Sequence, residues 1–439
     1  MGDARVEEQL RQLQENLARM LAEQAGRSSR AHSQYLESQQ VGLRRMAELA
    51  RLQAGLAETA VQVKPARPVL IDRALLEEFA SGSIERCLGP EYARYRDQRM
   101  PRIPNGVLLL MDRVVRLDGT RGSPNKLGEI ETEYDVPADV WYLQDQEERT
   151  TPYSVLMEMA LQPCGFLSAY LGSMLLVPGA NLFFRNLDGE ARLLRRIDLR
   201  GKTVTGWARM ASHTLSGDTL IQKFQFRLLA NGEAFFEGQS VFGFFPEETM
   251  LRQQGMDGGK ESLPAYLKPD FPPLGGRMLE LNSPNLHPGT GLRLSKERLA
   301  LLDEVFYQPA GGREGKGYVF ARRKIRPEDW FFKNHFFQDP VMPGSLGVEA
   351  ILEALRCVVL ESGWVNNPEA ARFTLAEQLV MNWKYRGQIL PSTDHMFLEV
   401  NLRQVENRGN ELIVAGDASL WADRIRIYEL KQIAITAAW

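Results

Sequence analysis

The chain has 439 residues, of which 44% are apolar and 25% are charged, with 53 basic against 56 acidic side chains. This length suggests two to four domains, and a net charge of −3 argues against a general nucleic-acid binder, whose surface would be strongly basic. The three cysteines, Cys87, Cys164 and Cys357, are too few and too far apart for a disulfide framework or for metal-ligand spacing.

The sequence of residues 1–65 predicts a helical linker. The first 60 residues contain no proline and are rich in Glu, Gln, Arg, Leu and Ala. Apolar side chains between residues 6 and 20 recur every three or four positions, as in a short coiled-coil seam. Both an amphipathic linker and a dimerising coiled coil fit this pattern, so a homodimer stays open. The charged N-terminus is not a secretory signal, and a cytoplasmic location is expected.

Two globular regions follow, residues 66–260 and residues 295–439, separated by a proline- and glycine-rich connecting segment at 261–294. The two regions resemble each other. Thr-Pro-Tyr-Ser at 151–154 corresponds to Met-Pro-Gly-Ser at 342–345, and the downstream Glu158 corresponds to Glu349, both at a separation of 191 residues. A nearly constant offset over some fifty residues indicates an internal duplication.

Each copy predicts the same order of elements. A strand-like segment is followed by a long apolar helix that opens after Pro152 or Pro343, and then by runs such as Lys-Phe-Gln-Phe-Arg in which apolar and polar residues alternate. Such alternation is typical of strands that are solvated on one face. The expected fold class is therefore α+β, with an antiparallel sheet wrapped around a central helix in each copy. The apolar stretch at 155–178 contains too many polar groups for a membrane span.

One motif in the second copy is specific. The run Asn334-His-Phe-Phe-Gln-Asp-Pro-Val-Met-Pro-Gly-Ser-Leu-Gly-Val-Glu349 resembles the FabA-like β-hydroxyacyl-acyl-carrier-protein dehydratases, including those of polyunsaturated fatty acid synthases and polyketide-synthase-like enzymes. The resemblance rests on the histidine, the Asp-Pro-Val-Met-Pro-Gly block and the acidic residue fourteen positions after the histidine. It implies a double hot-dog fold, in which two hot-dog subdomains form a pseudo-dimer.

The resemblance also implies partners. The substrate would be a thioester carried on the phosphopantetheine arm of an acyl carrier protein, and other synthase domains would accompany the chain. No other cofactor, no metal and no nucleic acid is implied.

The chemistry of dehydration points to particular residues. Removing water from a 3-hydroxyacyl thioester needs a base for the α-proton, and the His335 imidazole can serve at neutral pH. It also needs an acid for the departing hydroxyl, and the apolar neighbours of Glu158 would keep that carboxyl protonated. Gln162, one helical turn later, can orient the carboxyl. Backbone N–H groups at Gly344, where a helix begins, can stabilise the enolate oxygen.

The pairing of these groups follows from the resemblance. In the resembled family an active site lies between two hot dogs, with the histidine from one and the acid from the other, so His335 would pair with Glu158. The histidine slot of the first copy falls at or near Asp145, and no histidine lies nearby in the sequence. Glu349 would therefore face a slot without a base, and we expect Glu349 and Asp145 to belong to a non-functional second site.

Other functions stay open at this point. The same residues could isomerise 2-enoyl to 3-enoyl thioesters, alone or in addition to dehydration. A hot dog can also be a non-catalytic scaffold, and thioesterases share the fold but attack the carbonyl with water. Fold alone does not choose among these activities.

Overall fold

The computed structural model describes residues 67–439 apart from positions 97, 124–125, 146–149, 178–180, 273–274, 280 and 282–291. The expected helical linker at 1–65, with its possible role in dimerisation, lies outside the described residues, as does much of the connecting segment. Residues Pro68–Trp439 cluster into one unit.

The described part of the chain contains two long helices, several short helices and a series of strands. Its α-helices are α2 (Arg73–Ser81), α3 (Ile84–Leu88), α4 (Trp141–Gln144), α5 (Tyr153–Tyr170), α6 (Glu247–Leu251), α7 (Phe331–Asn334) and α8 (Gly344–Ser362). Its short 3-10 helices are η1 (Pro90–Tyr95), η2 (Gly106–Leu108), η3 (Ser173–Leu176), η4 (Ala265–Leu267) and η5 (Glu297–Leu299). Its strands are β1 (Arg113–Asp118), β2 (Glu129–Asp135), β3 (Leu182–Leu193), β4 (Thr203–Ser216), β5 (Thr219–Ala230), β6 (Glu233–Pro246), β7 (Arg277–Leu279), β8 (Glu304–Gln308), β9 (Tyr318–Lys324), β10 (Arg372–Leu375), β11 (Met381–Tyr385), β12 (His395–Arg408), β13 (Glu411–Ala422) and β14 (Ile425–Ala438).

The strands form one continuous antiparallel sheet, in the order β1-β2-β4-β5-β6-β3-β11-β14-β13-β12-β9-β8-β7, with β10 paired to β14. The first six strands of this order repeat in the second half as β8-β9-β12-β13-β14-β11. The duplication in the sequence is thus a duplication of topology. The predicted α+β class and double hot-dog fold are confirmed.

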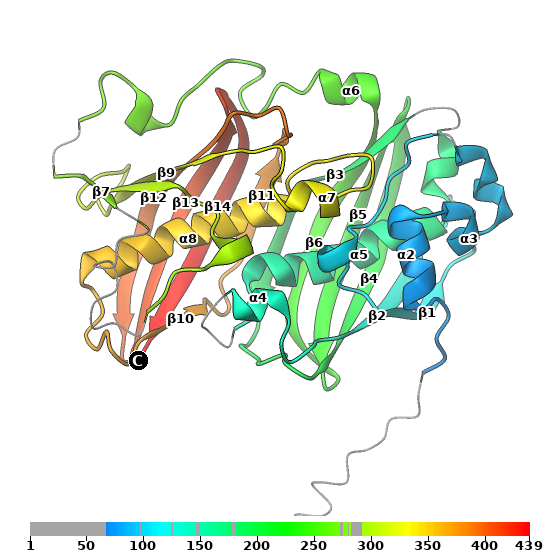
Figure 1. The fold of residues 1–439 in the computed structure, drawn as a ribbon, viewed down its shortest axis with the longest axis horizontal. Coiled ribbons are helices and arrows are strands. Elements are labelled where there is room, and N and C mark those ends of the chain that lie inside the picture. The colour runs from blue at the N-terminus through cyan, green and yellow to red at the C-terminus, as the bar shows by residue number, and fades with distance from the viewer. Residues whose placement is uncertain are drawn as a thin grey trace, which may run out of the picture. The chain divides into compact units, whose positions relative to one another are not determined.

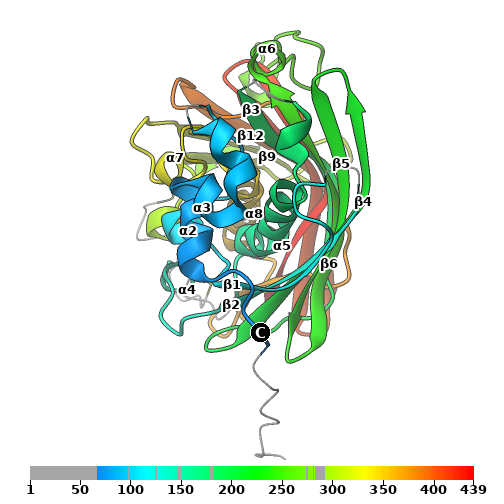
Figure 2. The ribbon, with the colours of Figure 1, turned by 90° about the vertical axis from the view of Figure 1, so that its right-hand side faces the viewer.

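Each half wraps its sheet around one long helix. Helix α5 lies against the first half of the sheet and α8 against the second (Figure 1), and the view along the molecule shows the sheet curving around both helices (Figure 2). Both helices begin directly after the predicted proline, Pro152 or Pro343. They are almost wholly apolar and almost wholly buried, because a helix without a polar face is stable only when it is covered on all sides. Within the described residues, no helix is long and apolar enough to cross a membrane.

The two halves join at the ladder between β3 and β11. Gly189 pairs with Trp383, whose indole is fully buried, and a Cβ atom at position 189 would lie only 2.2 Å from the Trp383 ring. The Trp383 indole N–H donates to the Asn186 side-chain oxygen at 2.9 Å, and the Arg386 guanidinium binds the Asp188 carboxylate at 2.9 and 3.0 Å. The absence of a side chain at Gly189 therefore lets the indole close the junction.

Part of the connecting segment packs on the outer face of the second half. The Tyr266 ring lies 4.6 Å from the Phe320 ring and 4.3 Å from the Phe306 ring, centroid to centroid. The backbone N–H of Ala265 donates to the Glu399 carboxylate at 2.9 Å. These described residues thus form a segment that crosses the second half and packs on it through a small hydrophobic cluster.

We predict that Gly189→Ala weakens the junction between the halves. The added methyl group overlaps the Trp383 ring, and overpacking of this kind costs about 1–3 kcal/mol of unfolding free energy. Chemical denaturation measures the loss. In a double-mutant cycle, Trp383→Leu should cost less in the Gly189→Ala background than in the wild type; strictly additive costs would contradict the overlap.

Candidate active site

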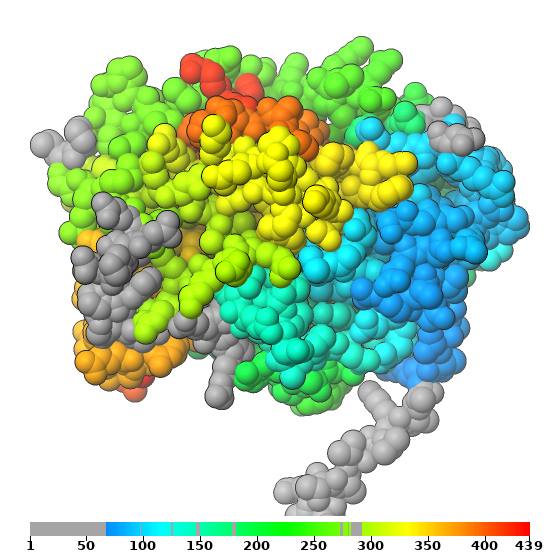
Figure 3. Space-filling view, in the orientation of Figure 1, coloured from blue at the N-terminus to red at the C-terminus, as the bar shows by residue number. Residues whose placement is uncertain are grey.

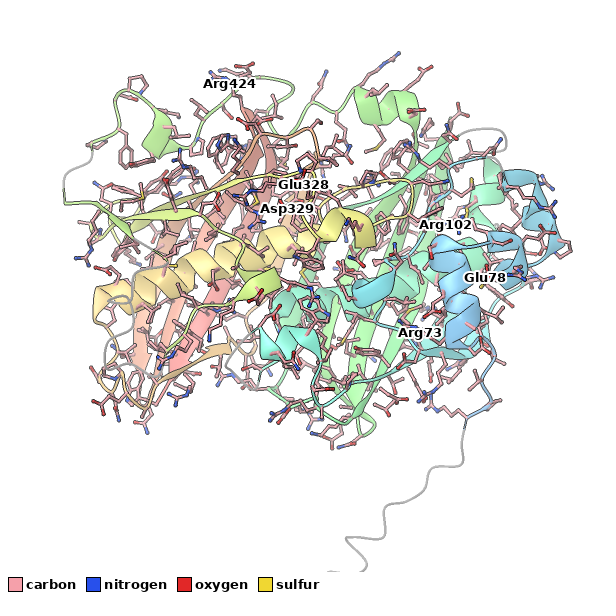
Figure 4. All side chains as sticks on the ribbon, viewed as in Figure 1. Arg73, Glu78, Arg102, Glu328, Asp329 and Arg424 are labelled. Carbon is pink, nitrogen blue, oxygen red and sulfur yellow. The ribbon has the colours of Figure 1, made fainter. Side chains whose placement is uncertain are left out.

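A cavity of about 100 Å³ opens between the two halves, beside the first turn of α8. It brings together four of the residues predicted from the sequence, Glu158 and Gln162 from α5, and His335 and Gly344 from the second half. Figure 3 shows the segments around α7, in yellow, lying against first-half segments in blue and cyan on the face that covers the central helices. Arg102, labelled in Figure 4, contributes from the first half to the cavity lining.

His335 directly follows the short helix α7 and is held by its own loop. The backbone N–H of Phe336 donates to the Asp339 carbonyl and the Asp339 N–H returns to the Phe336 carbonyl, at 3.1 and 3.2 Å. The His335 Nδ1 lies 3.0 Å from the Val341 carbonyl oxygen. Because a carbonyl can only accept, Nδ1 carries the proton in the neutral ring, and Nε2 keeps its lone pair.

The surroundings of His335 favour the neutral imidazole. Burial lowers the pKa of His335 below its ordinary value of 6.5, and the nearby Glu158 carboxylate opposes this effect. The positive charge of Arg185 lowers the pKa further, while Asp339 raises it. A lowered pKa leaves the ring unprotonated at neutral pH, the state that a general base requires.

Glu158 is buried and bound on both oxygens. The Ser345 hydroxyl, from the other half, donates to Oε1 at 2.7 Å, and the Gln162 amide donates to Oε2 at 3.2 Å. Gln162 is itself oriented by backbone groups, since its nitrogen donates to the Leu108 carbonyl at 2.7 Å and its oxygen accepts from the Leu110 N–H at 2.9 Å. The carboxyl group is therefore fixed within the cavity, and Gln162 has the position expected of a supporting residue.

Gly344 is the first residue of α8. The N–H groups of a first helical turn have no acceptor within the helix and carry the positive end of its dipole, so they can bind a developing oxyanion. A Cβ atom at 344 would lie 2.7 Å from the Tyr385 ring. Glycine at this position thus allows the Tyr385 ring to pack against the helix start.

An ion pair that was not predicted from the sequence holds the His335 loop to the other half. The Arg185 guanidinium, on β3, binds the Asp339 carboxylate through two hydrogen bonds of 2.6 and 2.7 Å, and both side chains are about nine-tenths buried. Gln388 accepts a third hydrogen bond from Arg185 at 2.8 Å. The signal was present as an arginine inside the apolar run of β3, but a single sequence does not show its partner.

The pseudo-equivalent second site contains a buried ion cluster. The Arg356 guanidinium donates to Glu349 at 3.0 Å and to Glu353 at 2.8 Å, and all three side chains are buried. The other Glu349 oxygen accepts the backbone N–H of Ser154, from the first half, at 3.1 Å. Burial raises the pKa of Glu353, and Arg356 opposes that effect. The carboxylate of Glu349 is thus engaged by an arginine, whereas Glu158 faces the cavity.

Asp145 occupies the position in the first half that Asn334 has in the second. The Asp145 carbonyl accepts the Lys296 N–H at 2.8 Å, and the Asn334 carbonyl accepts the Asn105 N–H at the same distance. The slot corresponding to His335 then falls on residue 146, next to the predicted Asp145 and outside the described residues. The Asp145 side chain is buried and accepts the Arg298 N–H at 3.2 Å.

Tyr153 stands where the second half has Gly344. Its ring is buried against Phe236, and its hydroxyl donates to the Ala191 carbonyl at 3.3 Å. A ring at the helix start and an arginine further along α8 together fill the region that is open in the first site.

The second half contains a segment that is similar to a known protein family. Residues 294–431, which include the His335 motif, match the family described as the FabA-like domain. The chain is also similar to one of the polyunsaturated fatty acid synthase proteins of a Thraustochytrium species, with 30% identity over 386 residues. The match covers 83% of this chain and 26% of that relative, so the chain spans about a quarter of the relative's length.

Solved structures resemble the chain more distantly. A dehydratase domain of the curacin polyketide synthase is 10% identical, with a TM-score of 0.39, over 74% of this chain and 96% of that one. A putative oleoyl thioesterase from Lactobacillus plantarum is 10% identical, with a TM-score of 0.40, over 72% and 98% of the two chains.

We predict that His335 titrates below its ordinary pKa and that Arg185→Met raises that pKa. The substitution removes a positive charge that disfavours the imidazolium and leaves the Asp339 carboxylate to favour it, so both changes act in the same direction. Histidine ring NMR resonances followed against pH measure both values, with His335→Gln identifying the signal. An unchanged or lower pKa in Arg185→Met would contradict this electrostatic arrangement.

The ion cluster of the second site generates a stability prediction. Arg356→Leu leaves two carboxylates buried without their cation, and breaking a buried pair in this way costs about 3–5 kcal/mol of unfolding free energy. The triple change that also converts Glu349 and Glu353 to glutamine should recover most of this loss, as measured by denaturant unfolding. Equal instability of the single and triple variants would show that packing dominates over charge.

Proposed function

We propose that the chain is a dehydratase that converts 3-hydroxyacyl thioesters to 2-enoyl thioesters, with one working site. A single observation carries the proposal: an imidazole that is neutral at physiological pH and a hydrogen-bonded carboxyl group, from opposite halves, line the same cavity at a helix N-terminus. A base, an acid and an oxyanion site are the groups that this elimination requires.

The proposed reaction uses each group once. The thioester carbonyl accepts hydrogen bonds from the N–H groups at the start of α8, beginning with Gly344, which acidifies the α-carbon. His335 Nε2 removes the α-proton, and protonated Glu158 donates its proton to the C3 hydroxyl, which leaves as water while the double bond forms. The imidazolium and the carboxylate then exchange a proton to restore the starting state. Gln162 and Ser345 hold the carboxyl through this cycle.

The substrate carrier is also a proposal. We infer that the acyl group arrives on the phosphopantetheine arm of an acyl carrier protein, in fatty acid biosynthesis, because the similar relative is named as part of a polyunsaturated fatty acid synthase. Other synthase domains would then act before and after this one. In the proposed step the His335 and Glu158 side chains carry out both proton transfers, and the backbone N–H groups stabilise the oxyanion, so the step needs no further cofactor.

We predict that Glu158→Gln lowers the dehydration rate strongly and that Glu349→Gln does not. Loss of an acid–base group costs roughly 10²–10⁴-fold in rate, so Glu158→Gln should lower dehydration by that factor. Glu349→Gln is the matched control, since it makes the same chemical change at the equivalent position of the other helix, and it should keep most of the activity. The assay incubates the protein with a 3-hydroxyacyl-carrier-protein and follows the loss of one water by mass spectrometry.

The assay separates the alternatives. Release of the free acid would indicate a thioesterase, formation of a 3-enoyl product would add isomerase activity, and no reaction in the wild type would favour a scaffold. Equal losses in the two variants would contradict the one-site assignment.

A further inference from the structure

One face of α5 is partly exposed to the cavity, whereas the corresponding face of α8 is buried. Between Tyr153 and Ala169 nearly every residue of α5 is buried, but Leu161 and Gly165 keep part of their surface exposed, and both line the cavity. Glu158 lies one turn before Leu161 on the same face. The positions that correspond along α8 are all buried.

The residue that closes this face in α8 is Arg356, and its counterpart in α5 is Gly165. The correspondence follows from the offset of 191 residues that relates Glu158 to Glu349, because Gly165 and Arg356 have the same separation. Position 165 lies three residues after Gln162, and Arg356 lies three residues after Glu353. At this position the long Arg356 side chain fills the interior of the second half. Gly165 has no side chain, so the corresponding space in the first half stays open.

The open region continues away from the reacting groups. Seven residues separate Glu158 from Gly165, so the cavity follows α5 for about 10 Å at the helical rise of about 1.5 Å per residue. Around Gly165 its lining is apolar. A Cβ atom at 165 would meet the Phe184 ring at 3.2 Å and the Ile103 side chain at 3.8 Å, and Phe184 stacks on Phe242, which also lines the cavity.

We propose that the residue at position 165 sets the length of acyl chain that the site accepts. The inference rests on the proposed function, in which the C3 hydroxyl lies at Glu158. The alkyl chain beyond C3 then runs along α5, passes over Leu161 and ends between Gly165 and Phe184. Burial of apolar CH₂ groups at this end stabilises long chains over short ones, and any side chain at 165 removes that space.

Chain-length dependence tests the proposal. The wild type, Gly165→Ala and Gly165→Val are each assayed with 3-hydroxybutyryl and 3-hydroxydecanoyl thioesters of pantetheine, and kcat/KM is compared within each protein. The ratio of long to short substrate should fall a few-fold in Gly165→Ala and at least tenfold in Gly165→Val, with the short substrate within about twofold of the wild type. Phe184→Leu, which enlarges the same region, should raise the ratio.

The short substrate serves as the internal control for damage to the catalytic groups, and Gly165→Ala guards against misfolding because alanine favours the helix. Equal loss on both substrates, or an unchanged ratio in both Gly165 variants, would overturn the assignment.

Binding is measured separately by the shift in melting temperature with saturated butyryl- and decanoyl-pantetheine. Without dehydration in the wild type the proposed function fails, while loss of the decanoyl shift alone in Gly165→Val would still support a length-limiting role.

Discussion

The structure depends on the burial of two apolar helices under one sheet. Neither α5 nor α8 has a face that water could cover, so each must be wrapped, and the two halves share a sheet through β3 and β11. That shared sheet sets the helices beside each other, with Ser345 at the start of α8 donating a hydrogen bond to Glu158 on α5. The cavity exists because the two wrapped helices meet there.

The pseudo-twofold arrangement is reproduced in detail around the site. The Trp141 indole donates to the Val107 carbonyl and the Trp330 indole to the Arg298 carbonyl, both at 3.1 Å, and the two rings contact each other with centroids 5.3 Å apart. Two differences between the halves lie at the site itself. One region is a cavity because it has glycine at positions 344 and 165. The equivalent region is a packed interior because Tyr153 and Arg356 occupy the corresponding positions.

The partners of the buried glutamates also differ between the cavity and the packed region. In the open site the buried Glu158 is bound by neutral donors, an amide and a hydroxyl, and it lines the cavity. In the filled region Glu349 is bound by the positively charged Arg356 guanidinium and does not line the cavity. Two equivalent glutamates thus have different chemical capacities because their partners differ, as the proposed one-site mechanism requires.

The sequence by itself determined the elements and their duplication. Pro152 and Pro343 marked the helix starts, alternating residues marked the strands, and a constant offset marked the repeat, because these are local or periodic signals. The motif around His335 and the apolar surroundings of Glu158 also identified the candidate acid and base. Only the tertiary structure decided which groups face each other: the pairing of Arg185 with Asp339, the capture of Glu349 by Arg356, and the open space at Gly165. Those contacts join residues far apart in the chain or depend on the volume left between packed helices, and neither is encoded in any short stretch of sequence.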